Sequence, residues 1–249
     1  MFKNSIRVLL MIFLIINAIG CTKNSNKSIQ PKSSKIQQMN VTNSPSKKKI
    51  SAVTLTAYPA SIAAVVNKKY YMPVTYVPKD LVYPNVPFLF NEKIEKRKMR
   101  KEAAKALERL FAAAKKDGIY LSGVSAYRSY STQKVLFNNY VKRDGFEKAR
   151  TYSAIPGTSE HQTGLAIDVS GSNGKCAATS CFANTKEATW LKKNCAKYGF
   201  IIRYPKGKES ITGYKYEPWH LRYVGNISTA IQTRGITLEE YLHVTPVSK

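Results

Sequence analysis

The sequence is poor in histidine, in acidic residues and in cysteine, and each shortage limits what the protein can do. Its 249 residues include only three histidines, and 15 aspartates and glutamates stand against 40 lysines and arginines. The resulting formal charge of +25 favours anionic partners, either nucleic acid or an anionic cell surface. Four cysteines without a convincing histidine partner argue against a thiol protease. No second hydrophobic span follows the first twenty residues.

The one long apolar run lies at the N-terminus and predicts export. Lys3 and Arg7 precede residues 8–16, a run that is short for a spanning helix and typical of a signal peptide. Residues 18–21 read Ala-Ile-Gly-Cys, which resembles a bacterial lipobox. We therefore expect a lipoprotein signal peptide over residues 1–20 and lipid on Cys21. The alternatives are an ordinary signal peptide or an uncleaved anchor.

The segment that follows is expected to be a tether. Residues 21–57 are rich in Ser, Asn and Lys, and Thr22–Ile50 contains seven lysines and no acidic residue. Such a segment cannot bury enough apolar surface to order itself. We expect the protein to be lipid-anchored to the outer face of the cytoplasmic membrane, facing the cell wall. Export argues against nucleic acid as a partner, despite the charge.

Two of the three histidines fall in segments that also place a carboxylate. His161 and Asp168 are too far apart for one helical face, but a turn at Gly164 followed by a strand brings both side chains together. His220 adds a second imidazole, and two histidines with one carboxylate are a ligand set of catalytic zinc, which leaves a position for water. Glu217 is then free to act as general base. A core histidine and a turn-capping aspartate are the alternative interpretation.

Three motifs in this order resemble the zinc D-alanyl-D-alanine carboxypeptidases of the VanY type, whose metallopeptidase group also includes hedgehog-like and phage endolysin domains. The motifs are Ser-x-Tyr-Arg-Ser at residues 125–129, Ser-x-His-x-x-Gly-x-Ala-x-Asp at residues 159–168 and Glu-x-x-His at residues 217–220. The resemblance covers about residues 64–243. It implies one Zn²⁺ ion, with His161, Asp168 and His220 as ligands and Glu217 as base.

The arginine of the first motif is the next candidate. A carboxypeptidase must bind a free C-terminal carboxylate or stabilise a developing oxyanion, and the guanidinium of Arg128 suits either task. A surface salt bridge is the alternative. Gln133 and Ser159 are candidates for hydrogen bonds to substrate, although each can equally be a capping or loop residue. We expect each histidine ligand to bond an acceptor through its second ring nitrogen.

Helical and strand patterns share residues 58–249, which we assign to one domain of the α+β class. Tyr70–Phe90 contains four prolines and indicates an extended arm, and a helix is expected from Asn91 to a stop at Gly118. Ser131 is expected to cap the next helix. The resemblance implies the hedgehog/DD-peptidase-like fold, a small antiparallel sheet with helices packed on one side.

Three cysteines remain once Cys21 is assigned to lipid. Export allows thiols to oxidise, so we expect one disulfide among Cys176, Cys181 and Cys195 and leave the pairing open. A second metal site is the alternative, but no histidine lies near these cysteines in the sequence.

Together these features predict an exported, monomeric zinc carboxypeptidase that removes C-terminal D-alanine from peptidoglycan stem peptides, a D,D-carboxypeptidase. The nearest alternative is an L,D-carboxypeptidase on tetrapeptide stems, and a third is an endopeptidase of the endolysin kind. A non-catalytic, zinc-containing wall-binding lipoprotein or a basic adhesin belongs to another class; Glu217 favours the enzyme over the former. The charge predicts salt-sensitive attraction to anionic wall polymer or membrane surface in every case.

Overall fold

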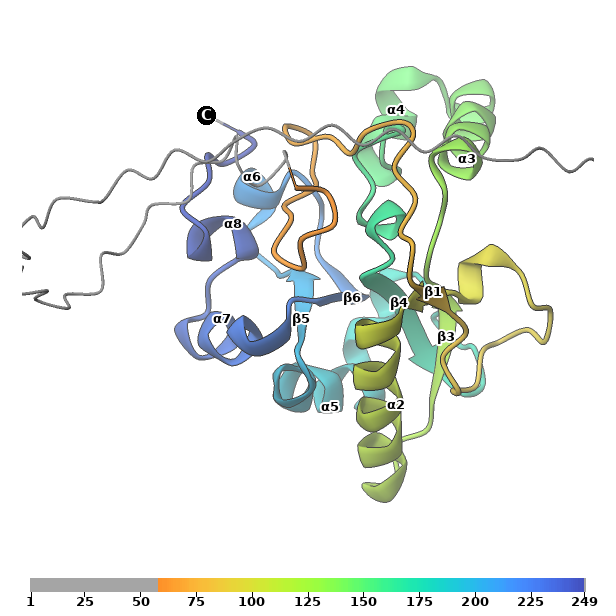
Figure 1. The fold of residues 1–249 in the computed structure, drawn as a ribbon, viewed down its shortest axis with the longest axis vertical. Helices are drawn as coiled ribbons and strands as arrows, with labels where there is room; N and C mark the ends of the chain where they lie inside the picture. Colours follow the sequence, from red (N-terminus) through yellow and green to blue (C-terminus); the bar gives the residue numbers. More distant parts are fainter. Residues whose placement is uncertain (1–57, 249) are drawn as a thin grey trace, which may run out of the picture. The chain divides into compact units, whose positions relative to one another are not determined.

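The computed structural model describes residues 58–248, and its centre is a four-stranded antiparallel sheet with strand order β3-β4-β6-β5 (Figure 1). These strands are β3 (Leu121–Ser125), β4 (Ala166–Gly171), β5 (Phe200–Tyr204) and β6 (Glu217–Tyr223). A separate two-stranded sheet pairs β1 (Leu81–Val82) with β2 (Met99–Arg100).

Short helices surround the sheet. The α-helices are α2 (Lys101–Lys116), α3 (Tyr130–Asp144), α4 (Phe146–Tyr152), α5 (Lys186–Asn194), α6 (Glu209–Thr212), α7 (Ser228–Arg234) and α8 (Leu238–Tyr241). The 3₁₀ helices are η1 (Glu95–Arg97), η2 (Glu160–Thr163), η3 (Ser180–Asn184), η4 (Cys195–Tyr198) and η5 (Gly225–Ile227). Within residues 58–248 no helix combines the length and the hydropathy that crossing a bilayer requires.

Alternation along the strands gives the sheet two faces with different roles. Ile167 and Val169 of β4 and Leu221 of β6 belong to the main apolar core, which also receives buried side chains from α2 and α5. Asp168 and His220, at the intervening positions, are therefore directed to the opposite face. A one-residue slip in register would reverse this arrangement, so core burial fixes where the polar side chains emerge.

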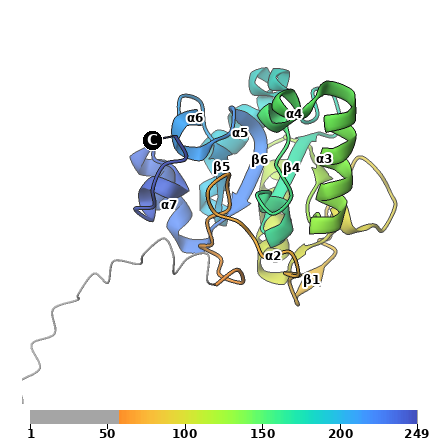
Figure 2. The same ribbon diagram turned by 90° about the horizontal axis from the view of Figure 1, so that it is seen from above.

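The helices divide into groups around the sheet. In both ribbon views α3 and α4 lie next to each other, away from α7 (Figures 1 and 2). On the β5 side, Ile231 of α7 and Leu238 of α8 pack with Ile201 in a second, smaller core. The α+β class and the small antiparallel sheet expected from the sequence are confirmed.

Two predictions of local structure are wrong. The helix expected from Asn91 begins only at Lys101, because Met99–Arg100 pair with β1 as a strand. The cap of α3 is Ser129 and not Ser131: the Ser129 hydroxyl accepts a hydrogen bond from the backbone N–H of Thr132 at 3.3 Å. The predicted signal peptide, lipid site and tether lie outside the described residues.

Candidate active site

His161 is placed by a short helix and a left-handed turn. It lies in η2, which ends at Gly164 with φ 68°. A side chain at position 164 would meet Leu81 at 3.0 Å and Arg100 at 3.1 Å, so both the conformation and the space require glycine. The Nδ1 atom of His161 lies 2.6 Å from the carbonyl oxygen of Ala126 and donates to it. This bond leaves Nε2 free to face Asp168, whose Oδ2 is 3.4 Å away.

Asp168 and His220 are brought together by strand pairing across 52 residues of sequence. They are directly opposite each other on β4 and β6, and neighbouring side chains on one face of such a pair lie in contact. The Nδ1 atom of His220 is 3.0 Å from Oδ1 of Asp168. The ring of Tyr204 lies against the His220 ring, with centroids 4.8 Å apart, and holds its plane.

The three side chains fit a divalent metal ion. One ligand atom from each of His161, Asp168 and His220 can be chosen so that all lie within 4.8 Å of one another. All three residues are buried. Two imidazole nitrogens and a carboxylate are a zinc-type donor set, although other divalent ions also accept it. The geometry assigns Nε2 of His161 and Nδ1 of His220 to the ion.

The charge states of these groups follow from burial and from their partners. Burial lowers the pKa of His161, which favours the neutral imidazole that binds metals. Burial raises the pKa of Asp168, but both histidines outweigh that effect and hold it well below its ordinary value. Asp168 is therefore ionised at neutral pH, as a ligand must be.

Glu217 lies beside this group without being part of it. It opens β6, where its backbone pairs with Tyr204 of β5, and its Oε2 is 3.9 Å from Nδ1 of His220. Burial raises the pKa of Glu217 to about 7. A carboxylate whose pKa is close to the working pH is suited to take and return protons.

Arg128 is held by side chains that flank it in sequence. Its Nη1 donates to Oε1 of Gln133 at 2.7 Å and its Nη2 donates to Oγ of Ser125 at 3.2 Å. Gln133 is fully committed, because its Nε2 donates to the carbonyl of Ala154 at 2.7 Å. The structure thus places Gln133 behind Arg128 as its support, whereas we expected it to contact substrate.

A cavity of about 460 Å³ joins these residues. His161, Asp168, Glu217, His220, Arg128 and Ser159 all line it. Tyr140 and Tyr152 from the α3–α4 pair contribute to its lining, as do Trp219 and Tyr216 next to Glu217. Seven site residues were expected from the sequence; six of them border this cavity, and Gln133 is the exception.

A buried cluster of charges lies beneath this site and was not foreseen. Arg203 of β5 and Arg222 of β6 both donate to Oε1 of Glu160, at 2.7 Å and 2.6 Å. Arg203 also donates to both oxygens of Glu239, at 2.9 Å and 2.6 Å. The four side chains have relative exposures of 1% or less. One arginine in each of β5 and β6, next to apolar residues, was the available signal.

Glu160 connects this cluster to His220. Its Oε2 lies 3.5 Å from Nε2 of His220, and within the described residues neither buried atom has a hydrogen-bond partner of its own. Burial raises the pKa of Glu160, but Arg203 and Arg222 outweigh it and hold the pKa well below its ordinary value. Burial lowers the pKa of His220, but the carboxylates of Asp168 and Glu160 outweigh it and raise the pKa to about 9. A metal ion must therefore displace the proton from Nδ1, while the anionic Glu160 favours keeping the other proton on Nε2.

We predict that Glu160→Gln weakens metal binding by about 10–100-fold, the usual effect of losing such a partner. The glutamine oxygen must accept from the two arginines, so its NH₂ faces Nε2 of His220 and forces the ring proton onto Nδ1. Competition with a fluorescent zinc chelator measures the affinity.

Glu239→Gln is the matched control. It disturbs the same buried cluster through Arg203, but Glu239 bonds Arg203 and Asn67 and does not contact His220. We expect it to lower the melting temperature and leave metal affinity within about twofold of the original chain. Equal losses of affinity in both variants would show that Glu160 acts through general stability alone.

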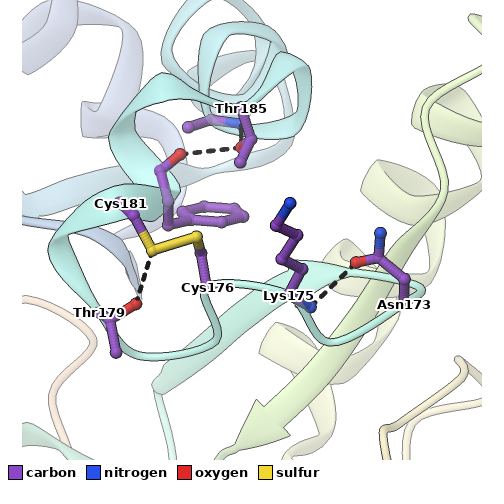
Figure 3. Close-up of a disulfide and its surroundings, with 8 residues drawn as sticks. Asn173, Lys175, Cys176, Thr179, Cys181 and Thr185 are labelled. Carbon is purple, nitrogen blue, oxygen red and sulfur yellow. Dashed lines mark hydrogen bonds between the residues drawn. A yellow bond between two sulfur atoms is a disulfide. The ribbon is translucent and has the colours of Figure 1, made fainter.

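The structure pairs Cys176 with Cys181 in a disulfide and leaves Cys195 as a buried thiol (Figure 3). Burial raises the pKa of Cys195 to about 12, so this thiol is unreactive. Trp190 packs against the main core and donates through Nε1 to Asp117 at 2.8 Å.

Comparison with known proteins gives one consistent result. A family model described as VanY, D-alanyl-D-alanine carboxypeptidase, matches residues 96–226. YodJ of Bacillus subtilis (strain 168), named for an inferred carboxypeptidase activity, is 52% identical over 195 residues, which are 78% of this chain and 71% of that protein.

Two solved structures show the same fold. The LdcB LD-carboxypeptidase, described as revealing peptidoglycan recognition, is 53% identical with a TM-score of 0.72, and the match covers 75% of this chain and 88% of that one. A mutant of the vancomycin-resistance D,D-pentapeptidase VanY in complex with Zn(II) is 33% identical with a TM-score of 0.58, over 72% of this chain and 98% of the other.

Proposed function

The chain belongs to the VanY family of D-alanyl-D-alanine carboxypeptidases, and from this premise we propose that it is a zinc-dependent enzyme that releases D-alanine from the C-terminus of peptidoglycan stem peptides. The observation that carries the proposal is the convergence of His161, Asp168 and His220 beside Glu217 in one cavity. The Zn(II) complex of a VanY relative supports the choice of metal.

Each residue has a defined task in this reaction. A zinc ion held by the three ligands would acidify a water molecule and polarise the scissile carbonyl. Glu217 accepts the proton of the attacking water and returns it to the leaving amine of D-alanine. One N–H group on each terminal nitrogen of Arg128 donates to Gln133 or Ser125, which holds the guanidinium in place. Its remaining N–H groups bind the terminal carboxylate or the developing oxyanion.

For the bond that is cut, we propose the L,D linkage of a tetrapeptide stem. The support is the higher identity to the LdcB LD-carboxypeptidase, at 53%, than to the D,D-pentapeptidase VanY, at 33%. From the sequence we expected the D,D reaction, with the L,D reaction as the nearest alternative. The motifs do not separate the two, because both substrates end in D-alanine with a free carboxylate. Separate synthetic tetrapeptide and pentapeptide stems distinguish the two reactions.

Activity is predicted to fall in acid because Glu217 must be ionised. Burial raises its pKa to about 7 in the chain alone, and a nearby dication lowers that value. Protonation of Glu217 removes the base. At pH values below the pKa of Glu217, which in the metal-loaded enzyme is under about 7, kcat/KM therefore falls about tenfold per pH unit. A profile of kcat/KM from about pH 4 to about pH 8 measures it; a flat profile, or an acid limb above pH 7, contradicts this role.

Export, lipidation at Cys21 and attraction to wall polymer stay predictions. They agree with a substrate in the cell wall, and they are tested by mass spectrometry of the membrane-bound protein for a lipid on its N-terminal cysteine.

A further inference from the structure

A disulfide closes the loop between β4 and α5. The crest of this loop, residues 178–180, borders the catalytic cavity. Cys176 and Cys181 are the bridged residues (Figure 3). The residues between them, Ala178, Thr179 and Ser180, line the same cavity as Glu217 and the candidate metal ligands. The disulfide therefore lies directly behind a part of the cavity surface that the reaction described above does not use.

The C-terminal side of the loop is anchored and its crest is exposed. Phe182, next to Cys181, is fully buried in the main core. Thr185 caps α5 by accepting from the backbone N–H of Ala188 at 3.2 Å. Thr179 and Ser180 are exposed. The anchor fixes where the loop ends, but it does not by itself fix how the crest faces the cavity.

The conformation of the crest is one that the sequence alone does not favour. Cys176 and Ala178 have φ of 62° and 51°, the left-handed region that is costly for residues with a side chain. Hydrogen bonds within the segment offset part of this cost. Thr179 N–H donates to the carbonyl of Cys176 at 3.3 Å, and Phe182 N–H donates to the carbonyl of Thr179 at 3.1 Å. The Thr179 hydroxyl donates to the sulfur of Cys181 at 3.1 Å. The covalent bridge removes the freedom of the loop to relax elsewhere.

We propose that the Cys176–Cys181 loop is a substrate-binding wall of the active site, held in its binding conformation by the disulfide. Thr179 and Ser180 are part of its cavity surface, and their hydroxyls carry no charge. The Ser180 hydroxyl can donate and accept, and the Thr179 hydroxyl, whose proton is directed to the sulfur of Cys181, can still accept. Such groups match the N–H and C=O groups of a peptide backbone. The loop thus binds the stem peptide, and this assignment rests on the proposed carboxypeptidase function.

The test compares the full, metal-loaded chain with its Cys176→Ser/Cys181→Ser variant. We expect KM for the stem peptide to rise about tenfold without the bridge, with kcat changed by less than about twofold. Metal content stays the same, since the loop contributes no ligand. Asn173→Ala is the control: it removes the bond from Lys175 N–H to Asn173 Oδ1 in the same connection, away from the cavity, and should leave KM unchanged.

Two further arms do not depend on how the double variant folds. Reduction of the folded original chain with TCEP breaks the S–S bond to two thiols, while the phosphine takes oxygen from water as its oxide; KM should rise as in the variant. TCEP should change nothing further in the double variant. Thr179→Ala/Ser180→Ala, which keeps the disulfide, should raise KM about fivefold if the hydroxyls bind substrate.

Direct binding separates this proposal from the function on which it rests. Titration calorimetry in a Glu217→Gln background gives the dissociation constant of the uncleaved stem peptide for each loop variant. A dissociation constant that rises about tenfold without the disulfide supports the proposal that the loop binds the stem peptide. An unchanged dissociation constant in both the serine variant and the TCEP-treated chain overturns this proposal. Absence of D-alanine release by the original chain would instead reject the carboxypeptidase function.

Discussion

Glu217→Gln is expected to lower kcat for D-alanine release by about 10³-fold while the chain keeps its metal ion. The amide has nearly the shape of the carboxylate but cannot accept the proton of the attacking water. Glu217 is not among the three converging ligand residues, and its oxygen is 3.9 Å from Nδ1 of His220, so its neutralisation leaves the metal group intact. Single-turnover assays with metal content determined on the same sample measure both quantities.

The matched control is Glu209→Gln. Glu209 is an exposed glutamate of α6, outside the lining of the catalytic cavity, and its neutralisation changes the net charge by the same amount. It should retain full activity. If Glu217→Gln kept more than about a tenth of the original kcat, Glu217 would not be the general base.

Arg128→Lys is expected to lower kcat/KM by about 100-fold although it keeps the positive charge. The guanidinium is oriented by donating 2.7 Å and 3.2 Å hydrogen bonds to Gln133 and Ser125, and this geometry aims its planar fork into the cavity. A lysine ammonium cannot make those two bonds and a paired contact to a carboxylate together. Steady-state kinetics on the stem peptide gives the change.

Two further variants show whether the effect of Arg128→Lys is specific to the position and orientation of this guanidinium. Arg234→Lys alters an exposed arginine of α7 and should leave kcat/KM unchanged. Gln133→Leu removes one support of the guanidinium and should cost less than Arg128→Lys itself, about tenfold. A lysine variant with near-original kcat/KM would show that charge alone suffices at this position.

The sequence revealed the site because its chemistry is local to three short motifs. Gly164 predicted the turn after His161, and the Glu217-x-x-His220 spacing predicted that a carboxylate lies beside an imidazole. The pairing of Asp168 with His220 is less local, since it depends on strand register across the sheet. Core burial of Ile167 and Leu221 sets that register, and their apolar alternation was visible in the sequence.

Other features depend on contacts that no local pattern encodes. Glu160 lies inside the central motif, but its partners Arg203 and Arg222 come from two other strands. The start of α2 was misplaced because Met99–Arg100 pair with a strand some twenty residues earlier. The choice among three cysteines needed the loop geometry that brings Cys176 and Cys181 together.

Removing and restoring the metal ion decides whether D-alanine release depends on the His161–Asp168–His220 site. The purified chain, with its metal counted, is incubated with tetrapeptide and pentapeptide stems before chelation, after chelation and after zinc is restored. We expect D-alanine from the tetrapeptide, none after chelation and recovery with zinc. Release from the pentapeptide alone would keep the mechanism and move the cleavage to the D,D bond. A zinc-loaded chain that releases D-alanine from neither peptide would contradict the carboxypeptidase function.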